Sequence, residues 1–521
     1  MTDLGRRTFL TTTASTASSA ALAASGLATR AGASPALVRR GRLTLPSGVQ
    51  SGDVTPDSAV LWARSSGRGR LVARVPGGRR AQRRRGRLAT RGTDFTAKLD
   101  LRGLRPGRDH EIDVWFEDEE GHRGERARLR FSTPALHPRS SSFVWSGDTC
   151  GQGWGINPDL GGLLGYRAMH ETRPDFFIHA GDTVYADNPI QAEVVEPDGQ
   201  IWRNLVTEEV SKVAETLREF RGRHRYTTMD ENVRAMYADV PVIAQWDDHE
   251  TTNNWYPGEI LEDERYTERR VDVLAARARR AWQENIPIRE PRRRQHDSGF
   301  VPARIYRKVP RGAHLDVFCL DMRTHKDPNT AGTETEMTRL LGQEQVDWLV
   351  REVRASTATW KVISADMPLG LVVPDGPVDQ ESLANRDPGQ PLGKELELAA
   401  VLSAFKRHGV KNVVWLTADV HYTAAHHYDP ARAAFTDFDP FWEFVAGPIA
   451  AGTFGPNALD GTFGPEVVFS KSAERPNESP RVGNQFFGHG AISADGSLTV
   501  SLRDLSGATL WSRTLEPDPV R

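Results

Sequence analysis

Five short apolar runs, each followed by an acidic residue, constrain this chain more than any other feature. The most distinctive spans residues 176–185, where Phe-Phe-Ile-His-Ala leads into a Gly-Asp turn with a tyrosine three residues later. Short apolar runs bounded by turn residues are typical of buried strands. In open α/β sheets, ligands bind beyond the carboxyl ends of the strands. We therefore predict that these acids lie close together: Asp148, Asp182, Asp248, Asp366 and Asp419.

Helical patterns fill the segments between these runs. Apolar residues in 340–353 recur at the spacing of an amphipathic helix, and a helical pattern over 395–408 ends before a glycine. Strand and helix therefore alternate, which predicts an α/β domain over residues 143–521. Residues 188–239 are charged and helical in pattern, for example at 210–220, and we interpret them as an insertion over the site. Further helices are predicted at 162–172 and 268–282, and a terminal hairpin at 488–515.

Residues 43–134 alternate apolar and polar positions between Gly, Pro and Asp turns. Short strands at this spacing predict a small β-sandwich domain of the fibronectin type III or immunoglobulin-like kind. The run Leu101–Gly107 resembles a corner of fibronectin type III modules, with His110 where their tyrosine stands. The arginines at 79–80 and 83–85 fit a solvated sheet edge better than a contact with anionic polymers.

The N-terminus has the pattern of a twin-arginine export signal. Arg6 and Arg7 precede a weakly apolar tract, and Ala31–Ala33 offers small residues for cleavage. We predict that residues 1–33 engage the twin-arginine export machinery and that the mature protein is secreted, into the medium or the cell envelope. No stretch approaches the roughly 20 apolar residues that a spanning helix needs, so no transmembrane segment is expected in the mature chain.

Composition argues against two other classes of protein. A formal net charge of −2 disfavours a dedicated nucleic-acid-binding module. Two cysteines cannot form a disulfide framework. Cys319 fits a buried strand, whereas Cys150 follows an acid by two positions at a strand end and is a candidate metal ligand.

Seven donor residues are predicted at or just past strand ends, and they are too acidic to share one crevice without cations. Buried carboxylates without a partner cost several kcal/mol each. Carboxylates suit hard ions such as calcium, magnesium or manganese, whereas a thiolate, a phenolate and an imidazole suit a transition metal. A mixed, multinuclear site is therefore predicted from Asp148, Cys150, Asp182, Tyr185, Asp248, Asp419 and His421.

The order and spacing of these donors resemble the calcineurin-like metallophosphoesterases, and more closely the PhoD-type alkaline phosphatases. The matching blocks are Asp148-x-Cys150, Gly181-Asp182-x-x-Tyr185, Trp246-Asp247-Asp248-His249-Glu250 and Asp419-x-His421. The resemblance implies an αββα sandwich catalytic domain that follows the β-sandwich. It also implies ferric iron (Fe³⁺) bound by Cys150 and Tyr185, with Asp182 bridging to calcium (Ca²⁺).

The predicted function is that of a secreted, metal-dependent phosphoric-ester hydrolase, as in the PhoD-type alkaline phosphatases. A metal-bound hydroxide would attack a phosphate ester and release phosphate, beside cations typically about 3.5–4 Å apart. His249 would donate a hydrogen bond or a proton, with Glu250 orienting its ring. Contacts to the phosphate are expected from Arg323, Asn253 or Asn254. The alternatives are a phosphodiesterase or phospholipase D-like activity, and a non-catalytic, metal-stabilised protein that binds the envelope.

Overall fold

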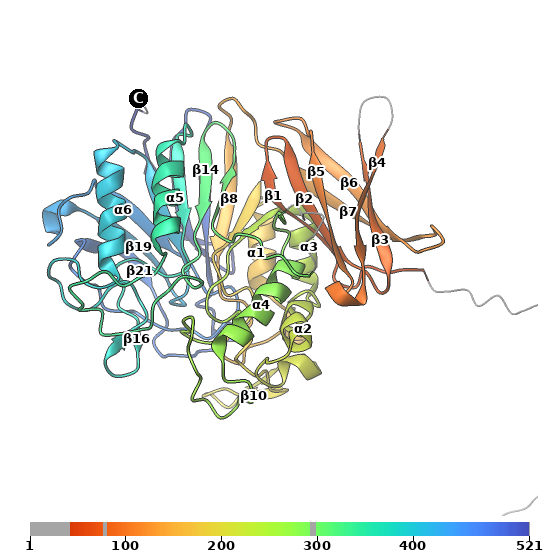
Figure 1. The fold of residues 1–521 in the computed structure, drawn as a ribbon, viewed down its shortest axis with the longest axis horizontal. Helices are drawn as coiled ribbons and strands as arrows, with labels where there is room; N and C mark the ends of the chain where they lie inside the picture. The colour runs from red at the N-terminus through yellow and green to blue at the C-terminus, as the bar shows by residue number, and fades with distance from the viewer. Residues whose placement is uncertain (1–41, 77–80, 292–298, 520–521) are drawn as a thin grey trace, which may run out of the picture. The chain divides into compact units, whose positions relative to one another are not determined.

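Two β-sheets packed face to face form the centre of the fold. The computed structural model describes residues 42–76, 81–291 and 299–519, so the predicted export signal at 1–33 lies outside the described residues. The first sheet has nine strands, in the spatial order β24 (Thr509–Leu515), β23 (Leu498–Asp504), β22 (Phe486–Ile492), β8 (Ser141–Ser146), β9 (Phe176–His179), β12 (Val242–Ala244), β1 (Val49–Thr55), β2 (Ser58–Arg64) and β5 (Thr96–Arg102) (Figure 1).

The second sheet has seven strands and contains the other predicted apolar runs. Its order is β13 (Arg307–Pro310), β14 (Leu315–Cys319), β15 (Trp360–Ser364), β18 (Val413–Thr417), β20 (Phe441–Val445), β19 (Thr423–Tyr428) and β21 (Pro465–Lys471). Two small hairpins lie outside the sheets: β10 (Glu193–Val195) with β11 (Ile201–Arg203), and β16 (Pro374–Asp375) with β17 (Asp379–Gln380).

Helices cover the outer face of each sheet. The nine-stranded sheet packs against α1 (Leu164–Glu171), α2 (Leu217–Thr227), α3 (Glu231–Asp239) and α4 (Val271–Asn285), and the seven-stranded sheet against α5 (Gln343–Arg354) and α6 (Glu395–Arg407). None of the helices among the described residues is both long and apolar enough to cross a membrane.

Alternation along each strand decides which layer a side chain fills. On β8, Phe143 and Trp145 pack between the two sheets, whereas Val144 packs among the helices. On β15, Val362 packs between the sheets and Ile363 packs towards α5 and α6. The layers are therefore helix, sheet, sheet and helix, and the predicted αββα sandwich is confirmed.

The predicted helix at 210–220 begins too early. Only Glu208–Val210 forms a short 3₁₀ turn there, and α2 begins at Leu217. The start is set by a capping box, because the Thr216 hydroxyl accepts a hydrogen bond from the Glu219 amide and the Glu219 carboxylate accepts one from the Thr216 amide. The spacing of apolar residues alone did not predict that the helix begins at this cap.

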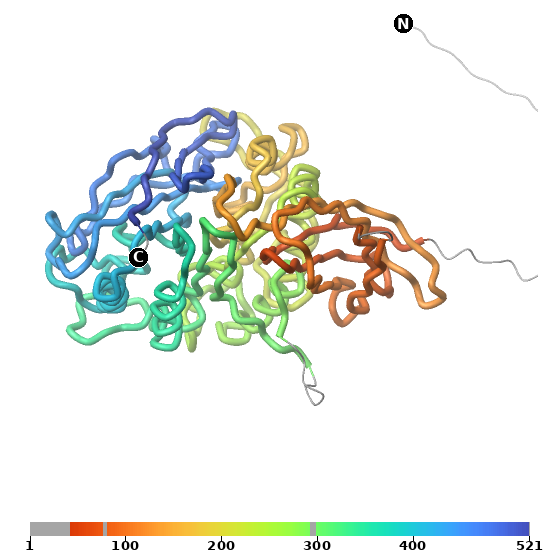
Figure 2. The backbone as a smooth tube through the Cα atoms, turned by 90° about the horizontal axis from the view of Figure 1, so that it is seen from above, coloured from red at the N-terminus to blue at the C-terminus, as the bar shows by residue number. Residues whose placement is uncertain are grey.

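The N-terminal strands form a β-sandwich that is joined to the larger fold by backbone pairing. A four-stranded sheet of β4 (Gln82–Ala89), β3 (Gly69–Val75), β6 (Asp109–Glu117) and β7 (Arg123–Ser132) packs on β1, β2 and β5. Strand β1 pairs in parallel with β12 at Gly52 and Val242. A Cβ at residue 52 would lie 2.7 Å from the Val242 carbonyl oxygen, so glycine permits this approach. Figure 2 shows these red and orange strands at one end of the described chain.

A buried histidine on α2 makes the stability of the fold depend on pH. Burial lowers the pKa of His224 from 6.5 to about 3. Between pH 6.5 and 3 the unfolded chain therefore binds a proton that the folded chain does not, and stability falls as the pH falls, by about 1.4 kcal/mol per pH unit. We expect His224→Leu to reduce this slope in urea unfolding measured from pH 7 to pH 4. An unchanged slope would show that His224 is not the source of this pH dependence.

Candidate metal centre

Four acids follow strands of the two central sheets. Asp148 and Asp182 come after β8 and β9, which are parallel neighbours. Asp248 follows β12, which is parallel to β9, and Asp419 follows β18 of the second sheet. Because the carboxyl ends of parallel strands open at the same edge of a sheet, these segments deliver their side chains to one region.

Five of the seven predicted donors, together with Asp247 and His249, form three overlapping groups, in each of which the ligand atoms lie within 4.8 Å of one another. The groups are Asp148, Asp182 and His421; Asp182, Asp248 and His249; and Asp247, Asp248 and Asp419. Asp182 and Asp248 each belong to two groups, so the three form a continuous cluster. Tyr185 adjoins it, because its hydroxyl oxygen lies 2.7 Å from Nε2 of His421.

The backbone of this cluster is held in unusual conformations. The φ angles are in the left-handed region: 67° at Asp148, 49° at Asp182, 67° at Asp419 and 56° at His421. Such conformations cost on the order of 1 kcal/mol for a residue other than glycine, and they concentrate at functional sites. Neighbouring glycines permit the close approach, since a Cβ at Gly181 would lie 2.6 Å from Cβ of Asp247.

The buried carboxylates fit positively charged ligands. Both side-chain oxygens of Asp148 are buried without a hydrogen-bond partner. Burial raises the pKa of Asp148 to about 8 and raises the pKa of Asp182 and Asp419 well above the ordinary value. A carboxyl group in this position favours the neutral acid unless a cation is bound, so the donor set matches a site for metal ions.

His249 lies in this cluster and is held by an acid that the sequence interpretation missed. Its Nδ1 lies 2.8 and 2.9 Å from the two carboxylate oxygens of Asp187. Burial lowers the pKa of His249, but the negative charges of Asp187, Asp248 and Asp182 outweigh burial and raise it well above 6.5. The imidazole is therefore held in orientation through Nδ1, and the acids around it favour its protonated form.

The predicted role of Glu250 is wrong. Its carboxylate accepts hydrogen bonds from the amide and hydroxyl of Thr183 at 2.7 and 2.6 Å, and from the amide of Asp247 at 2.8 Å. Glu250 therefore joins the loops after β9 and β12 instead of orienting the ring of His249. Asp187 comes two residues after Tyr185, and the apolar-run pattern offers no signal that distinguishes it from a turn residue.

Cys150 is not brought into the three groups. Among the described residues, none of the groups of close donors contains its sulfur, and the side chain belongs to the core that also holds Tyr166 and Tyr226. Burial raises the pKa of its thiol. The next residue does adjoin the site, since a Cβ at Gly151 would lie 2.6 Å from the ring of Tyr185. An iron–thiolate bond at Cys150 stays a prediction.

Arg323 is completely buried behind the cluster. Its guanidinium donates to Asp247 at 2.6 Å and to Asp366 at 3.2 Å, and it also contacts Glu381. Asp366 thus partners Arg323 and belongs to none of the three groups of close donors. Nη2 of Arg323 lies 4.0 Å from a carboxylate oxygen of Asp248 and 4.0 Å from one of Asp419. Nη2 also contacts Asp247, so a phosphate contact from Arg323 stays a prediction.

The two asparagines after the Asp-Asp-His-Glu block are engaged by acids. The amide of Asn253 donates to Asp187 at 3.0 Å, and the amide of Asn254 donates to Asp248 at 2.5 Å. The side chain of Asn254 donates to Asp375 at 2.9 Å, and Asp375 belongs to the β16–β17 hairpin. A phosphate contact from either asparagine therefore stays a prediction.

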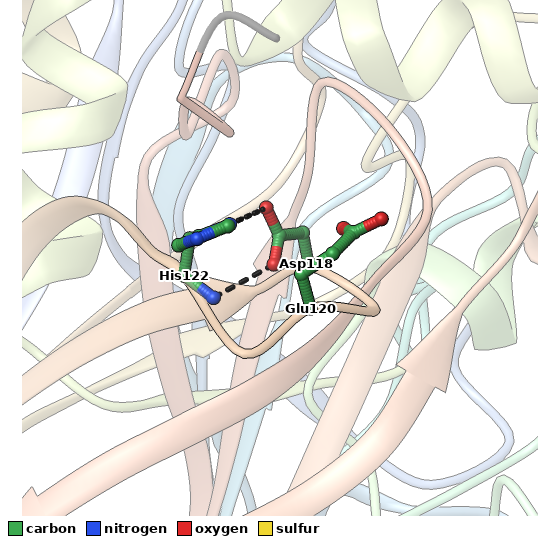
Figure 3. Close-up of side chains that lie close together, drawn as sticks. All are labelled: Asp118, Glu120 and His122. Atoms are coloured by element: carbon green, nitrogen blue, oxygen red, sulfur yellow. Dashed lines mark hydrogen bonds and ion pairs between the residues drawn. The ribbon is translucent and has the colours of Figure 1, made fainter. Parts of the chain in front are cut away.

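A fourth group of close donors lies away from this cluster. Figure 3 shows Asp118, Glu120 and His122 on the turn between β6 and β7, where Asp118 accepts hydrogen bonds from the His122 amide at 2.7 Å and pairs with its ring at 3.1 Å. The His122 side chain is 76% exposed. Water competes for exposed carboxylates, and the hydrogen bonds of Asp118 fit a structured turn, so we assign no ion here.

Comparisons with known proteins identify the family. The PhoD-like phosphatase domain matches residues 143–502, and the N-terminal domain of PhoD-like phosphatases matches residues 31–124. Alkaline phosphatase D of Bacillus subtilis (strain 168) is 26% identical over 440 residues, which span 78% of this chain and 70% of that protein.

Two solved structures share the fold. One described as the structure of PhoD has a TM-score of 0.65 at 19% identity, and the match covers 92% of this chain and 93% of the other. Purple acid phosphatase PPD1 from yellow lupin (Lupinus luteus) seeds has a TM-score of 0.53 at 12% identity, with 91% and 74% covered. The chain therefore belongs to the PhoD-like phosphatases and is a metal-dependent phosphoric-ester hydrolase.

Proposed function

We propose that this chain is an exported alkaline phosphatase that releases phosphate from monoesters at the cluster around Asp148, Asp182 and Asp248. The observation that carries this proposal is that His249, held at Nδ1 by Asp187, lies in the same cluster as Asp148, whose two carboxylate oxygens have no hydrogen-bond partner. A non-catalytic site with structural metals would not need that histidine. The cluster thus combines the parts that hydrolysis of a phosphate ester requires.

Ferric iron and calcium are the ions we assign to the cluster. Tyr185 would hold Fe³⁺, and the family resemblance adds Cys150, although its sulfur lies outside the groups of close donors. Asp182, which belongs to two of these groups, would be a further ligand. Asp148, Asp248, Asp419 and His421 would supply the remaining donors, and their carboxylates suit Ca²⁺. When bound, the ions supply positive charge to the phosphoryl oxygens and activate a water molecule.

His249 is the proton donor in this proposal. Asp187 holds Nδ1, which leaves Nε2 of the protonated ring to donate to a phosphoryl oxygen or to the leaving oxygen. The ring also lies against Tyr185, with ring centres 4.2 Å apart, so its orientation is restricted on a second side. A fixed cationic donor stabilises the charge that develops as the ester bond breaks.

The test of function is a comparison of two nitrophenyl substrates. Protein loaded with iron and calcium should hydrolyse 4-nitrophenyl phosphate faster than bis(4-nitrophenyl) phosphate. A large preference for the diester would replace the monoesterase with a phosphodiesterase of the phospholipase D-like kind. Hydrolysis of neither ester would favour the metal-stabilised envelope-binding protein.

Export through the twin-arginine machinery is a separate part of the proposal. Arg6 and Arg7 would direct the chain, and folding around iron before export gives this route a physical purpose. Replacing both by lysine should leave the phosphatase inside the cell, as measured by fractionation. Export of the double variant at the normal level would contradict this route.

Iron bound by Tyr185 predicts a visible absorption band. A phenolate bound to Fe³⁺ gives a charge-transfer transition, so Tyr185→Phe should lose the colour. Tyr166→Phe is the matched control, because Tyr166 is equally buried but contacts Thr149 and His179 instead of the cluster. An unchanged band in Tyr185→Phe at normal iron content would remove Tyr185 from the ligand set.

A further inference from the structure

The N-terminal domain carries a charged sheet face that the proposed chemistry does not use. In the four-stranded sheet, alternate residues such as Leu71, Val114 and Leu129 pack into the domain core. The residues between them face outward. On this outer face, six arginines share three carboxylates of β6; we call Arg74, Arg83, Arg85, Arg126, Arg128 and Arg130 the arginine face.

The carboxylates do not neutralise these arginines. Three guanidinium groups surround Asp113 at 3.3 to 3.8 Å, two surround Glu111 at 3.0 and 3.4 Å, and two contact Glu117. Arg130 reaches one more acid, Asp239 of α3, at 3.0 Å. The six arginine side chains remain 48% to 63% exposed. Positive charge is therefore in excess on this face and accessible to a ligand.

The whole domain has the same charge bias. Residues 43–134 contain 18 arginines and one lysine against 12 acids, a net charge of +7, whereas the whole chain has −2. Charge separation of this kind raises the local concentration of anions at the basic end of a molecule. The arginine face is thus part of a domain whose formal net charge is opposite in sign to that of the remaining chain.

We infer that the arginine face binds a linear polymer of phosphate groups, in place of the solvated sheet edge that the sequence alone favours for residues 83–85. Arg126, Arg128 and Arg130 lie at alternate positions of β7, so their Cα atoms repeat every ~6.8 Å along the strand. Arg83 and Arg85 form a second row on β4. Guanidinium groups bind phosphate oxygens in pairs, and rows of them match an extended polyanion better than a single anion. This inference does not depend on the reaction proposed for the metal centre.

Other anionic partners fit this face less well. Among the described residues, the large exposed apolar side chains lie outside β3, β4, β6 and β7, so the face lacks the groups that insert into a lipid surface. The one tryptophan there, Trp115, is 6% exposed and lies under Arg123, whose guanidinium carbon is 4.4 Å from the ring centre. Bases of single-stranded nucleic acid would find no open ring on which to stack.

Binding of long-chain inorganic polyphosphate by the full, metal-loaded protein tests this inference. Affinity should fall steeply between 50 and 200 mM salt, because each phosphate that is neutralised releases counterions. In Arg126→Ser/Arg128→Ser, we expect affinity at 50 mM salt to fall at least tenfold and the salt dependence to become shallower. Hydrolysis of 4-nitrophenyl phosphate should stay unchanged, which shows that the variant is folded.

A matched pair of arginines controls for total charge. Arg265 and Arg270 are 53% and 65% exposed and paired with acids, but they lie on the loop before α4. Arg265→Ser/Arg270→Ser should leave polyphosphate binding unchanged. Equal losses in both double variants would overturn the inference, as would no loss in Arg126→Ser/Arg128→Ser. Tighter binding to vesicles of anionic phospholipid, or to a sulfated polysaccharide, than to polyphosphate would also overturn the choice of ligand.

Discussion

Replacing His249 by alanine is expected to lower kcat/KM for a phosphate monoester by roughly 10²- to 10⁴-fold, the range typical of losing a positioned proton donor. Bound iron and calcium should stay close to the normal content, because the carboxylates of Asp148, Asp182 and Asp248 remain. Metal analysis and steady-state kinetics on the same preparation would measure both quantities. Undiminished turnover would reject the role of His249, whereas a parallel loss of metal would make this residue a ligand.

Variants of two neighbouring acids, Asp187 and Glu250, distinguish the loss of the contact to Nδ1 of His249 from general damage to the site. Asp187→Asn removes the charge beside Nδ1, so the pKa of His249 should fall. Activity that depends on the protonated ring should then be lost at a lower pH than in the parent enzyme. Glu250→Gln should not shift the pH profile in this way, because Glu250 contacts Thr183 and Asp247 and not the ring. The same shift of the pH profile in both variants would contradict the role of Asp187 as the acid that holds His249.

Asp148→Asn is expected to change stability in opposite directions with and without metal. Burial raises the pKa of Asp148 from 3.8 to about 8, so in metal-free protein the folded chain binds a proton that the unfolded chain releases between these values. Stability without metal should therefore fall as the pH rises from 4 to 8, by up to several kcal/mol. The asparagine has no charge to bury, so the metal-free variant should melt at a higher temperature at pH 8.

The metal-loaded proteins should show the reverse order. Here the Asp148 carboxylate stabilises a bound cation, and the asparagine loses that charge interaction and part of the metal affinity. Thermal melts with chelator and with saturating metal, at pH 5 and pH 8, would measure the four differences. A variant that is destabilised equally in both states would show that Asp148 has only a packing role.

The layered fold and the meeting of the acids could be predicted because they rest on local patterns. Apolar runs mark the strands, and a strand end fixes where the next acid lies, so Asp148, Asp182, Asp248 and Asp419 could be named without coordinates. The pairing of β1 with β12 could not be predicted, since Gly52 and Val242 are far apart in the sequence and an ordinary strand pattern does not choose its neighbour.

The contacts behind the cluster could not be predicted from the sequence either, because they also depend on tertiary structure. Whether Asp187 or Glu250 faces Nδ1 of His249 depends on how two loops fold over each other, and both acids lie near predicted donors. Arg323 follows a core strand, which is equally compatible with contacting substrate and with neutralising Asp247 and Asp366. Residue type and spacing are the same whether Arg323 contacts substrate or neutralises buried acids. Only the tertiary structure distinguishes these two roles.

Because β1 pairs with β12, the N-terminal β-sandwich cannot be removed without exposing an edge within the nine-stranded sheet. Removal of residues 1–142 would leave β12 paired only with β9 and would expose its other edge, the kind of surface on which other chains nucleate aggregates. A phosphatase shortened in this way should precipitate, whatever the state of its metal ligands.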